Sequence, residues 1–160
     1  MGVNLTSIPL SARRAIEAQF ALRMYTVALP TLGPDAALRV LNAAIDAAAR
    51  EAGQAFAACA PHSTPSLEHF SQVLDTWQAG GALTITDLER GPDFLNFSVS
   101  RCGYMEMYRD MDLPTVLHAT LSCRRDAAFA EGYSPQLRLE RPETISGGAA
   151  RCLFMFRWVP

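Results

Sequence analysis

The stretch Phe94-Leu95-Asn96-Phe97-Ser98-Val99-Ser100, followed by Arg101 and Cys102, decides the fold class. Its aromatic and β-branched residues follow the turn-forming run Gly91-Pro92-Asp93, a pattern that predicts a strand. Upstream, Leu83 and Ile85 alternate with threonines, which indicates a preceding strand joined to this one through residues 89–93. Downstream, Leu137 and Leu139 alternate with polar residues, and residues 152–158 form a further apolar strand after the Gly147-Gly148 turn.

The chain before this region has a helical pattern. Ser11 can cap a helix over residues 12–28, with Ile16, Phe20 and Met24 or Val27 on one face. A second, alanine-rich helix is expected from Pro34 to about Cys59, and a third from Ser66 to the glycine pair at 80–81. Helices are also expected over residues 104–111 and 113–131, the latter with a possible break near Ser122 and an end at Gly132.

These patterns predict one α+β domain spanning residues 1–160. Residues 11–79 would form a helical half, packed on an antiparallel sheet of about four strands with one or two inserted helices in residues 82–158. A chain of 160 residues suits a single domain.

Composition excludes several function classes. The 49% hydrophobic and 19% charged content is typical of a globular protein, and a net charge of -2 gives no reason to expect nucleic acid as a partner. All 14 basic residues are arginine, which excludes a lysine Schiff base. Residues 1–7 lack the pattern of a signal peptide, and Asp46, Arg50 and Glu51 interrupt the alanine-rich stretch, so no membrane span is expected. We therefore expect a cytoplasmic protein with reduced cysteines, which could form a homo-oligomer.

The cysteines are the residues from which we expect chemistry. Cys123 precedes Asp126 by three positions, one turn if the stretch is helical, so thiol and carboxyl would share a face. A thiolate at Cys123, favoured by Arg124 or Arg125, could attack an electrophilic carbon, and Asp126 could move a proton. The alternative is a packed Cys123 thiol with Asp126 paired to an arginine.

The other thiols have less distinctive surroundings. Cys102 follows a predicted strand and could support Cys123 or replace it as nucleophile. Cys152 opens an apolar strand and favours packing, and Cys59 is expected in the core. No cofactor is expected; the alternative is zinc bound by Cys102, Cys123 and Cys152 with Asp126 or His118, although no Cys-x-x-Cys pair supports it.

Four segments in the C-terminal part resemble the L-2-amino-thiazoline-4-carboxylic acid hydrolase family. They are Val99-Ser100-Arg101-Cys102-Gly103-Tyr104, residues 121–132 with Cys123-Arg124-Arg125-Asp126, Leu139-Glu140-Arg141-Pro142-Glu143-Thr144-Ile145, and Gly148 with Cys152-Leu153-Phe154. The resemblance implies hydrolytic opening of a small nitrogen heterocycle, such as a cyclic amidine, urea or lactam, with that heterocycle as the partner molecule. Leu153 stands where family members often have an acidic residue, which leaves the exact substrate open.

The resemblance also suggests substrate-binding roles. Arg141 could hold a substrate carboxylate through a bidentate bond, instead of pairing with Glu140 or Glu143 on the surface. Glu143 and Thr144 could add polar contacts, and His118 could act as a base. The arrangement of cysteines and the glycine pair also resembles, more distantly, the 4-vinyl reductase sensor domains, which bind ligands without catalysis. A non-catalytic binding domain is therefore the alternative.

Overall fold

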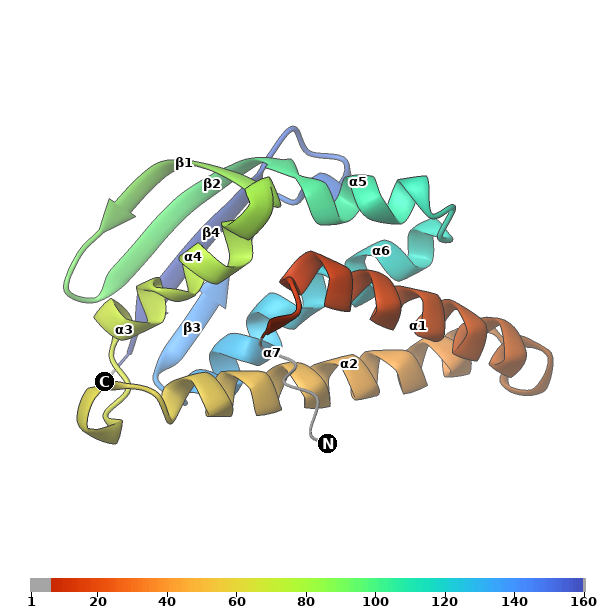
Figure 1. Cartoon of the computed structure of the whole chain (residues 1–160), viewed down its shortest axis with the longest axis horizontal. Coiled ribbons are helices and arrows are strands. Elements are labelled where there is room, and N and C mark those ends of the chain that lie inside the picture. Colours follow the sequence, from red (N-terminus) through yellow and green to blue (C-terminus); the bar gives the residue numbers. More distant parts are fainter. Residues whose placement is uncertain (1–6, 160) are drawn as a thin grey trace.

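The computed structural model describes residues 7–159. Residues 1–6, on which most of the signal-peptide expectation rests, lie outside the described part. The chain starts with a long helical hairpin, α1 (Leu10–Leu32) and α2 (Pro34–Ala57), which extends to one side of the sheet (Figure 1). Gly33 makes the turn at a φ of 76°, and Pro34 opens α2 at a position where its missing N–H costs no hydrogen bond. Helix α1 begins before Ser11 and includes it, so Ser11 is not the cap.

Two short helices follow where one was expected. Helix α3 (Leu67–Ser71) is capped by Ser66, whose hydroxyl accepts from the His69 N–H at 3.2 Å, and α4 (Val73–Gln78) follows across Gln72. Both lie against one face of the sheet (Figure 1). Cys59 lies beyond the end of α2 and is exposed, so its expected place in the core is wrong. The helix ends two residues before it, ahead of Pro61.

The four predicted strands form one antiparallel sheet. They are β1 (Leu83–Arg90), β2 (Phe94–Cys102), β3 (Leu137–Glu140) and β4 (Cys152–Trp158), in the order β1-β2-β4-β3. In the register of the central pair, Phe97 lies opposite Phe154 and Val99 opposite Cys152. The fold is therefore α+β, with the decisive stretch of the sequence as a central strand.

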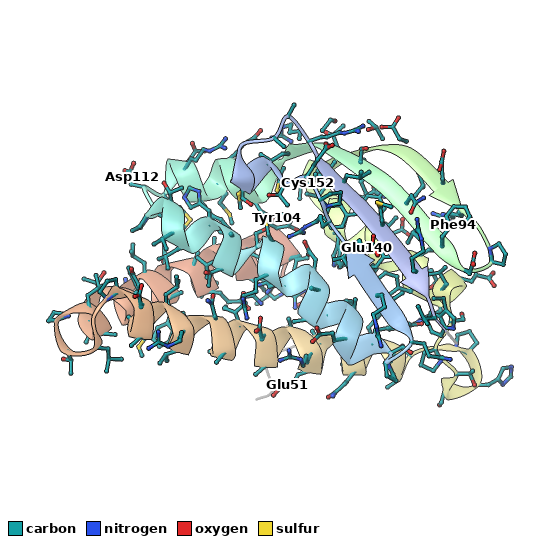
Figure 2. All side chains as sticks on the ribbon, turned by 180° about the vertical axis from the view of Figure 1, so that it is seen from behind. Glu51, Phe94, Tyr104, Asp112, Glu140 and Cys152 are labelled. Atoms are coloured by element: carbon teal, nitrogen blue, oxygen red, sulfur yellow. The ribbon has the colours of Figure 1, made fainter. Side chains whose placement is uncertain are left out.

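Three helices are inserted between β2 and β3. They are α5 (Gly103–Asp110), α6 (Thr115–Leu121) and α7 (Cys123–Tyr133). The predicted break at Ser122 is confirmed, because that residue leaves helical geometry at φ -120° and ψ -75°. Gly132 does not end α7 but lies inside it, where the helix crosses α2. Figure 2 shows α7 between α2 and the sheet.

The buried apolar residues form two clusters. One lies between the sheet and helices α3, α4 and α7, and includes Phe70, Phe97 and Phe156. The other joins α1 and α2 to α5 and α6, and includes Tyr108 and Leu117. Leu83 and Cys102, at neighbouring strand ends, pack against both.

Helix α1 presents its larger apolar residues to solvent. Ile16, Phe20, Met24 and Val27 share a face as predicted, and all four are exposed. The buried face of the helix instead consists of Ala18, Ala21 and Tyr25. Small residues allow the close approach of α1 to α2. No helix within residues 7–159 has the length and apolar character needed to cross a membrane.

Candidate active site

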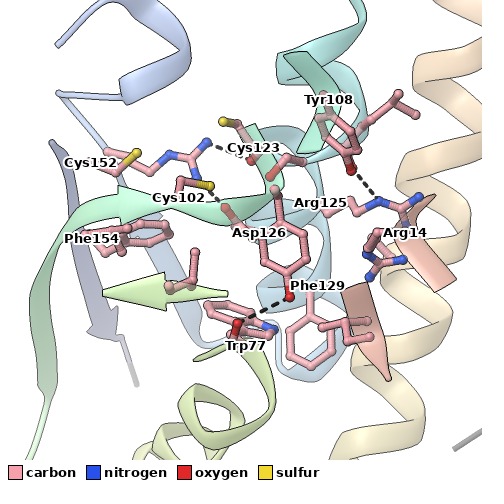
Figure 3. A pocket seen from close by; sticks show the side chains of 18 of the residues that line it. Arg14, Trp77, Cys102, Tyr108, Cys123, Arg125, Asp126, Phe129, Cys152 and Phe154 are labelled. Carbon is pink, nitrogen blue, oxygen red and sulfur yellow. Dashed lines mark hydrogen bonds and ion pairs between the residues drawn. The ribbon is translucent and has the colours of Figure 1, made fainter. Parts of the chain in front are cut away.

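A partly open cavity lies where the two apolar clusters meet (Figure 3). Its volume is about 70 Å³, which suits a small molecule. The walls come from α1, α2, α4, β2, α5, α7 and β4, so distant parts of the sequence contribute to it. The aromatic walls are formed by Trp77, Tyr104, Tyr108, Phe129 and Phe154. Figure 2 places Tyr104 and Cys152 at the junction of helices and sheet.

Three of the four thiols line this cavity, each at the end of an element. Cys102 is the last residue of β2, Cys123 the first of α7, and Cys152 the first of β4. Burial raises the pKa of Cys102 to about 11, and burial also raises the pKa of Cys152, whose sulfur accepts from the Ile145 N–H at 3.2 Å. These two therefore stay protonated at neutral pH. The Cys123 Sγ lies 3.1 Å from the hydroxyl oxygen of Ser146.

Asp126 lies one turn after Cys123 on α7, and both line the cavity. Its carboxylate is ion-paired with Arg141, which also donates to the backbone oxygen of Cys123 at 2.7 Å. The guanidinium of Arg141 lies 5.0 Å from the ring centroid of Phe154. Burial raises the pKa of the Asp126 carboxyl, and Arg141, followed by Arg14 and Arg125, opposes this rise. Arg141 therefore connects Cys123 to Asp126.

A second group of charges lies at the other end of the cavity. Arg125 is buried and donates to the Leu121 carbonyl oxygen at 2.9 Å and to Glu17 at 2.7 Å. Burial lowers the pKa of Arg125. Arg14 lies 2.7 Å from the same Glu17 carboxylate and also lines the cavity. Three arginines line the cavity, and the two carboxylates bound to them, Asp126 and Glu17, leave one positive charge in excess, which favours an anionic group.

Not all of the predicted residues meet here. Cys102, Cys123, Asp126 and Arg141 line the cavity together, whereas Glu143, Thr144 and His118 do not. Glu143 pairs with Arg151 on the surface, and the Thr144 hydroxyl accepts from the Gly147 N–H at 3.1 Å. His118 is buried in α6, and its Nε2 lies 3.0 Å from the Leu113 carbonyl oxygen. It is not part of the cavity lining.

The zinc alternative requires the three thiols to converge with a further ligand. Within residues 7–159, no group of three or more histidine, cysteine, aspartate or glutamate side chains is arranged to hold a metal ion. Cys123 and Cys152 instead contact Ser146 and the Ile145 N–H. The arrangement of donors therefore gives no support to the zinc alternative.

Several wall residues lay outside the sequence prediction. Arg14 and Trp77 lie in helices whose pattern showed only packing, and Ser146, which contacts Cys123 from outside the cavity lining, stands in a short turn. Arg125 was considered only as a cation near Cys123, whereas it reaches back to α1. Its position in the Cys-Arg-Arg-Asp run was the one available signal.

The comparisons with known proteins agree with this architecture. A solved structure with a similar fold is described as the crystal structure of the phenol-responsive sensory domain of the transcription activator PoxR with phenol. The match has 10% sequence identity and a TM-score of 0.52, and covers 91% of this chain and 74% of that chain, so it shows the fold alone. Among curated protein sequences, none matches this chain. The model of one family matches residues 13–156, which include nearly the whole cavity lining. The chain therefore belongs to the L-2-amino-thiazoline-4-carboxylic acid hydrolase family.

Proposed function

We propose that this protein is a hydrolase that opens a small nitrogen heterocycle inside this cavity, with Cys123 as the nucleophile. The observation that carries the proposal is the placement of Cys123 and Asp126 one turn apart on α7, both facing the cavity and both bound by Arg141. Membership of the family supports the reaction class. Cys102 and Cys152 are less suited to attack, because burial raises the pKa of both thiols.

In the proposed reaction, Cys123 attacks as the thiolate, and its sulfur forms a bond to the amidine-like ring carbon. One ring bond of that carbon, to nitrogen or sulfur, then breaks, and Asp126 supplies a proton to the departing heteroatom. Water adds to the same carbon, the carbon–sulfur bond to Cys123 breaks, and a proton returns to Asp126. The raised pKa of Asp126 suits this role, because a larger share of the carboxyl is protonated than in an exposed aspartate. Cys102 would support the site as a neutral thiol beside the substrate.

The cavity walls suggest how the ring would be held. Trp77, Tyr104 and Phe129 offer flat apolar surfaces, and the Tyr104 hydroxyl donates to the Trp77 carbonyl oxygen at 3.3 Å. A substrate carboxylate would meet Arg14, because Arg141 has Asp126 to itself, whereas Arg14 shares the single Glu17 carboxylate with Arg125. Binding of the substrate carboxylate, the role that the sequence suggested for Arg141, would then fall to Arg14 on α1.

The proposal is tested by ring-opening turnover. Wild type, Cys123→Ala and Asp126→Asn would be incubated with cyclic amidines, ureas and lactams, led by L-2-amino-thiazoline-4-carboxylate, and the products measured by mass spectrometry. We expect turnover by wild type, none by Cys123→Ala, and a loss of about 10²–10⁴-fold in kcat for Asp126→Asn. Cys59→Ala is the matched control, because that thiol is exposed and outside the cavity.

Equal turnover by wild type and Cys123→Ala would reject Cys123 as the nucleophile. Turnover lost in Cys102→Ala but kept in Cys123→Ala would transfer the role to Cys102. Each variant would be checked for its thermal midpoint, so that a loss of folding is not read as a loss of chemistry.

A ligand-binding domain without catalysis is the second candidate. The observation that favours it is the shared fold with a sensory domain whose structure contains phenol, together with the aromatic walls of the cavity. Isothermal titration of small ring compounds would then give saturable binding with no product. Binding should also survive Cys123→Ala, since ring stacking does not need the thiol.

A further inference from the structure

Ser146 stands beside the Cys123 thiol and is held there by its own turn. It lies in a short 3-10 helix, η4 (Ile145–Gly147), in the loop between β3 and β4. Its hydroxyl oxygen is 3.1 Å from Cys123 Sγ and 3.3 Å from Thr144 Oγ1. Thr144 in turn accepts from the Gly147 N–H at 3.1 Å, and Gly148 closes the turn in the left-handed region at φ 94°. The hydroxyl thus has a position fixed independently of Cys123.

The Ser146 hydroxyl has one proton and two neighbours that can accept it. When Cys123 is a thiol, its S–H can point to the Ser146 oxygen while Ser146 donates to Thr144. When Cys123 loses its proton, the serine hydroxyl can turn and donate to the sulfur. Hydrogen bonds to a charged acceptor are stronger than those to a neutral one, so this rotation of the serine hydroxyl favours the thiolate.

The sulfur is also reached from a second side. A more open groove is formed by α2, α6, α7 and the η4 loop. Cys123 and Arg141 line both this groove and the cavity, whereas Ser146 lines the groove but not the cavity. Cys123 therefore lies in the wall between the two spaces, with Ser146 on the solvent side. A small reagent in the groove meets this thiol without first passing the aromatic walls.

We infer that Ser146 is a positioning residue that stabilises the Cys123 thiolate by turning its hydroxyl from Thr144 to the sulfur. Its role in turnover rests on the proposed function, whereas its effect on the thiol does not. Removing the hydroxyl should lower the reactivity of Cys123 and leave the turn intact, because the Thr144–Gly147 contact that holds η4 does not involve it. In a working enzyme, kcat should fall while KM stays nearly unchanged.

The experiment measures alkylation of the full chain by iodoacetamide between pH 6 and 10, with peptide mass spectrometry to follow each cysteine separately. In Ser146→Ala we expect Cys123 to react about tenfold more slowly at pH 7, with its pH profile moved to higher pH by about one unit. Ser146→Thr keeps a hydroxyl and should restore most of the rate. Ser100→Ala, which removes an exposed serine hydroxyl from β2, should leave Cys123 unchanged.

The outcomes separate this inference from the proposed function. An unchanged Cys123 profile in a folded Ser146→Ala overturns the inference even if the protein turns over substrate. Slower Cys123 alkylation with rescue by threonine supports it even if no substrate is ever opened, in which case the proposed function fails alone. If Ser146→Ala shifts Cys102 and Cys152 as much as Cys123, the effect is a general loosening of the site, and the inference is wrong.

Discussion

At the scale of single residues, surroundings and not residue type distinguish the four thiols. Cys59 is exposed, Cys102 and Cys152 are protonated because burial raises their pKa, and Cys123 contacts a hydroxyl. The sequence shows only that three of them fall in segments resembling a hydrolase family. It is the end of a strand or the start of a helix that directs each of these three into the cavity.

This difference predicts the pH dependence of thiol alkylation. Cys59 should react faster than Cys102 at pH 7, because Cys59 is exposed and Cys102, with a pKa of about 11, is then a thiolate in about one molecule in ten thousand. For an acid whose pKa is raised, the charged form appears only as the pH rises toward that value. The rate for Cys102 should therefore rise about tenfold per pH unit up to about pH 11. Peptide mass spectrometry of iodoacetamide-treated protein would measure it, and a plateau for Cys102 near pH 8 would contradict the burial argument.

At the scale of elements, the crossing of α2 and α7 positions the site, because α7 starts at Cys123 and carries Asp126. Two glycines allow this crossing. A Cβ on Gly53 would lie 2.2 Å from the Phe129 carbonyl oxygen, and one on Gly132 would lie 2.2 Å from that of Arg50. Backbone atoms cannot move aside as a flexible side chain would, so the helices could cross this closely only at glycine.

We therefore expect Gly53→Ala to destabilise the fold. Helix propensity alone predicts a gain of about 1 kcal/mol for this change, whereas the clash with α7 predicts a loss of about 1–3 kcal/mol. The reverse change at an exposed site of the same helix, Ala55→Gly, is the control and should cost about 1 kcal/mol. Urea unfolding followed by circular dichroism measures both. A Gly53→Ala variant more stable than wild type would show that α2 and α7 do not approach this closely.

At the scale of the whole molecule, two apolar clusters meet around a cavity, and packing in one of them supports a wall of the site. Phe70 is fully buried, and its ring lies 6.2 Å from that of Phe129, which lines the cavity, and 4.8 Å from that of Phe156 in β4. Phe20, in contrast, is 63% exposed on α1. Phe70 is thus a core residue and Phe20 a surface residue, although both lie in helices.

Phe70→Ala should lower the free energy of unfolding by about 3–5 kcal/mol, because it leaves a hole in the cluster. Phe20→Ala should change it by less than about 0.5 kcal/mol, since little area is buried there. Thermal or urea denaturation of the two variants side by side gives the comparison. A similar loss for both would mean that the exposed face of α1 is covered in solution.

Local patterns were sufficient where a segment decides its own structure. The four strands, the break at Ser122 and the turn at Gly147-Gly148 each follow from residues close in sequence. Patterns failed where a distant element decides. Gly132 was expected to end α7, but α2 passes over it, and the apolar face of α1 was found in solvent because alanines on the other face approach α2 more closely. For the site, the sequence indicated Cys102, Cys123, Asp126 and Arg141, with an arginine partner for Asp126 as an alternative, but neither which arginine it is nor the contact of Ser146 with Cys123.

The sequence by itself determined the fold class, the family and the helical turn that joins Cys123 to Asp126, because periodicity and motif spacing are local properties of the chain. Only the tertiary structure decided that Arg141 binds Asp126, that Arg14 and Arg125 share Glu17 across two helices, and that Ser146 meets the Cys123 sulfur. The contacts of Arg141, Arg125 and Ser146 join residues 15 to 108 positions apart, whereas Arg14 and Glu17 lie one turn apart on α1. Burial, which sets the protonation of Cys102 and Asp126, likewise exists only once the helices close on the sheet.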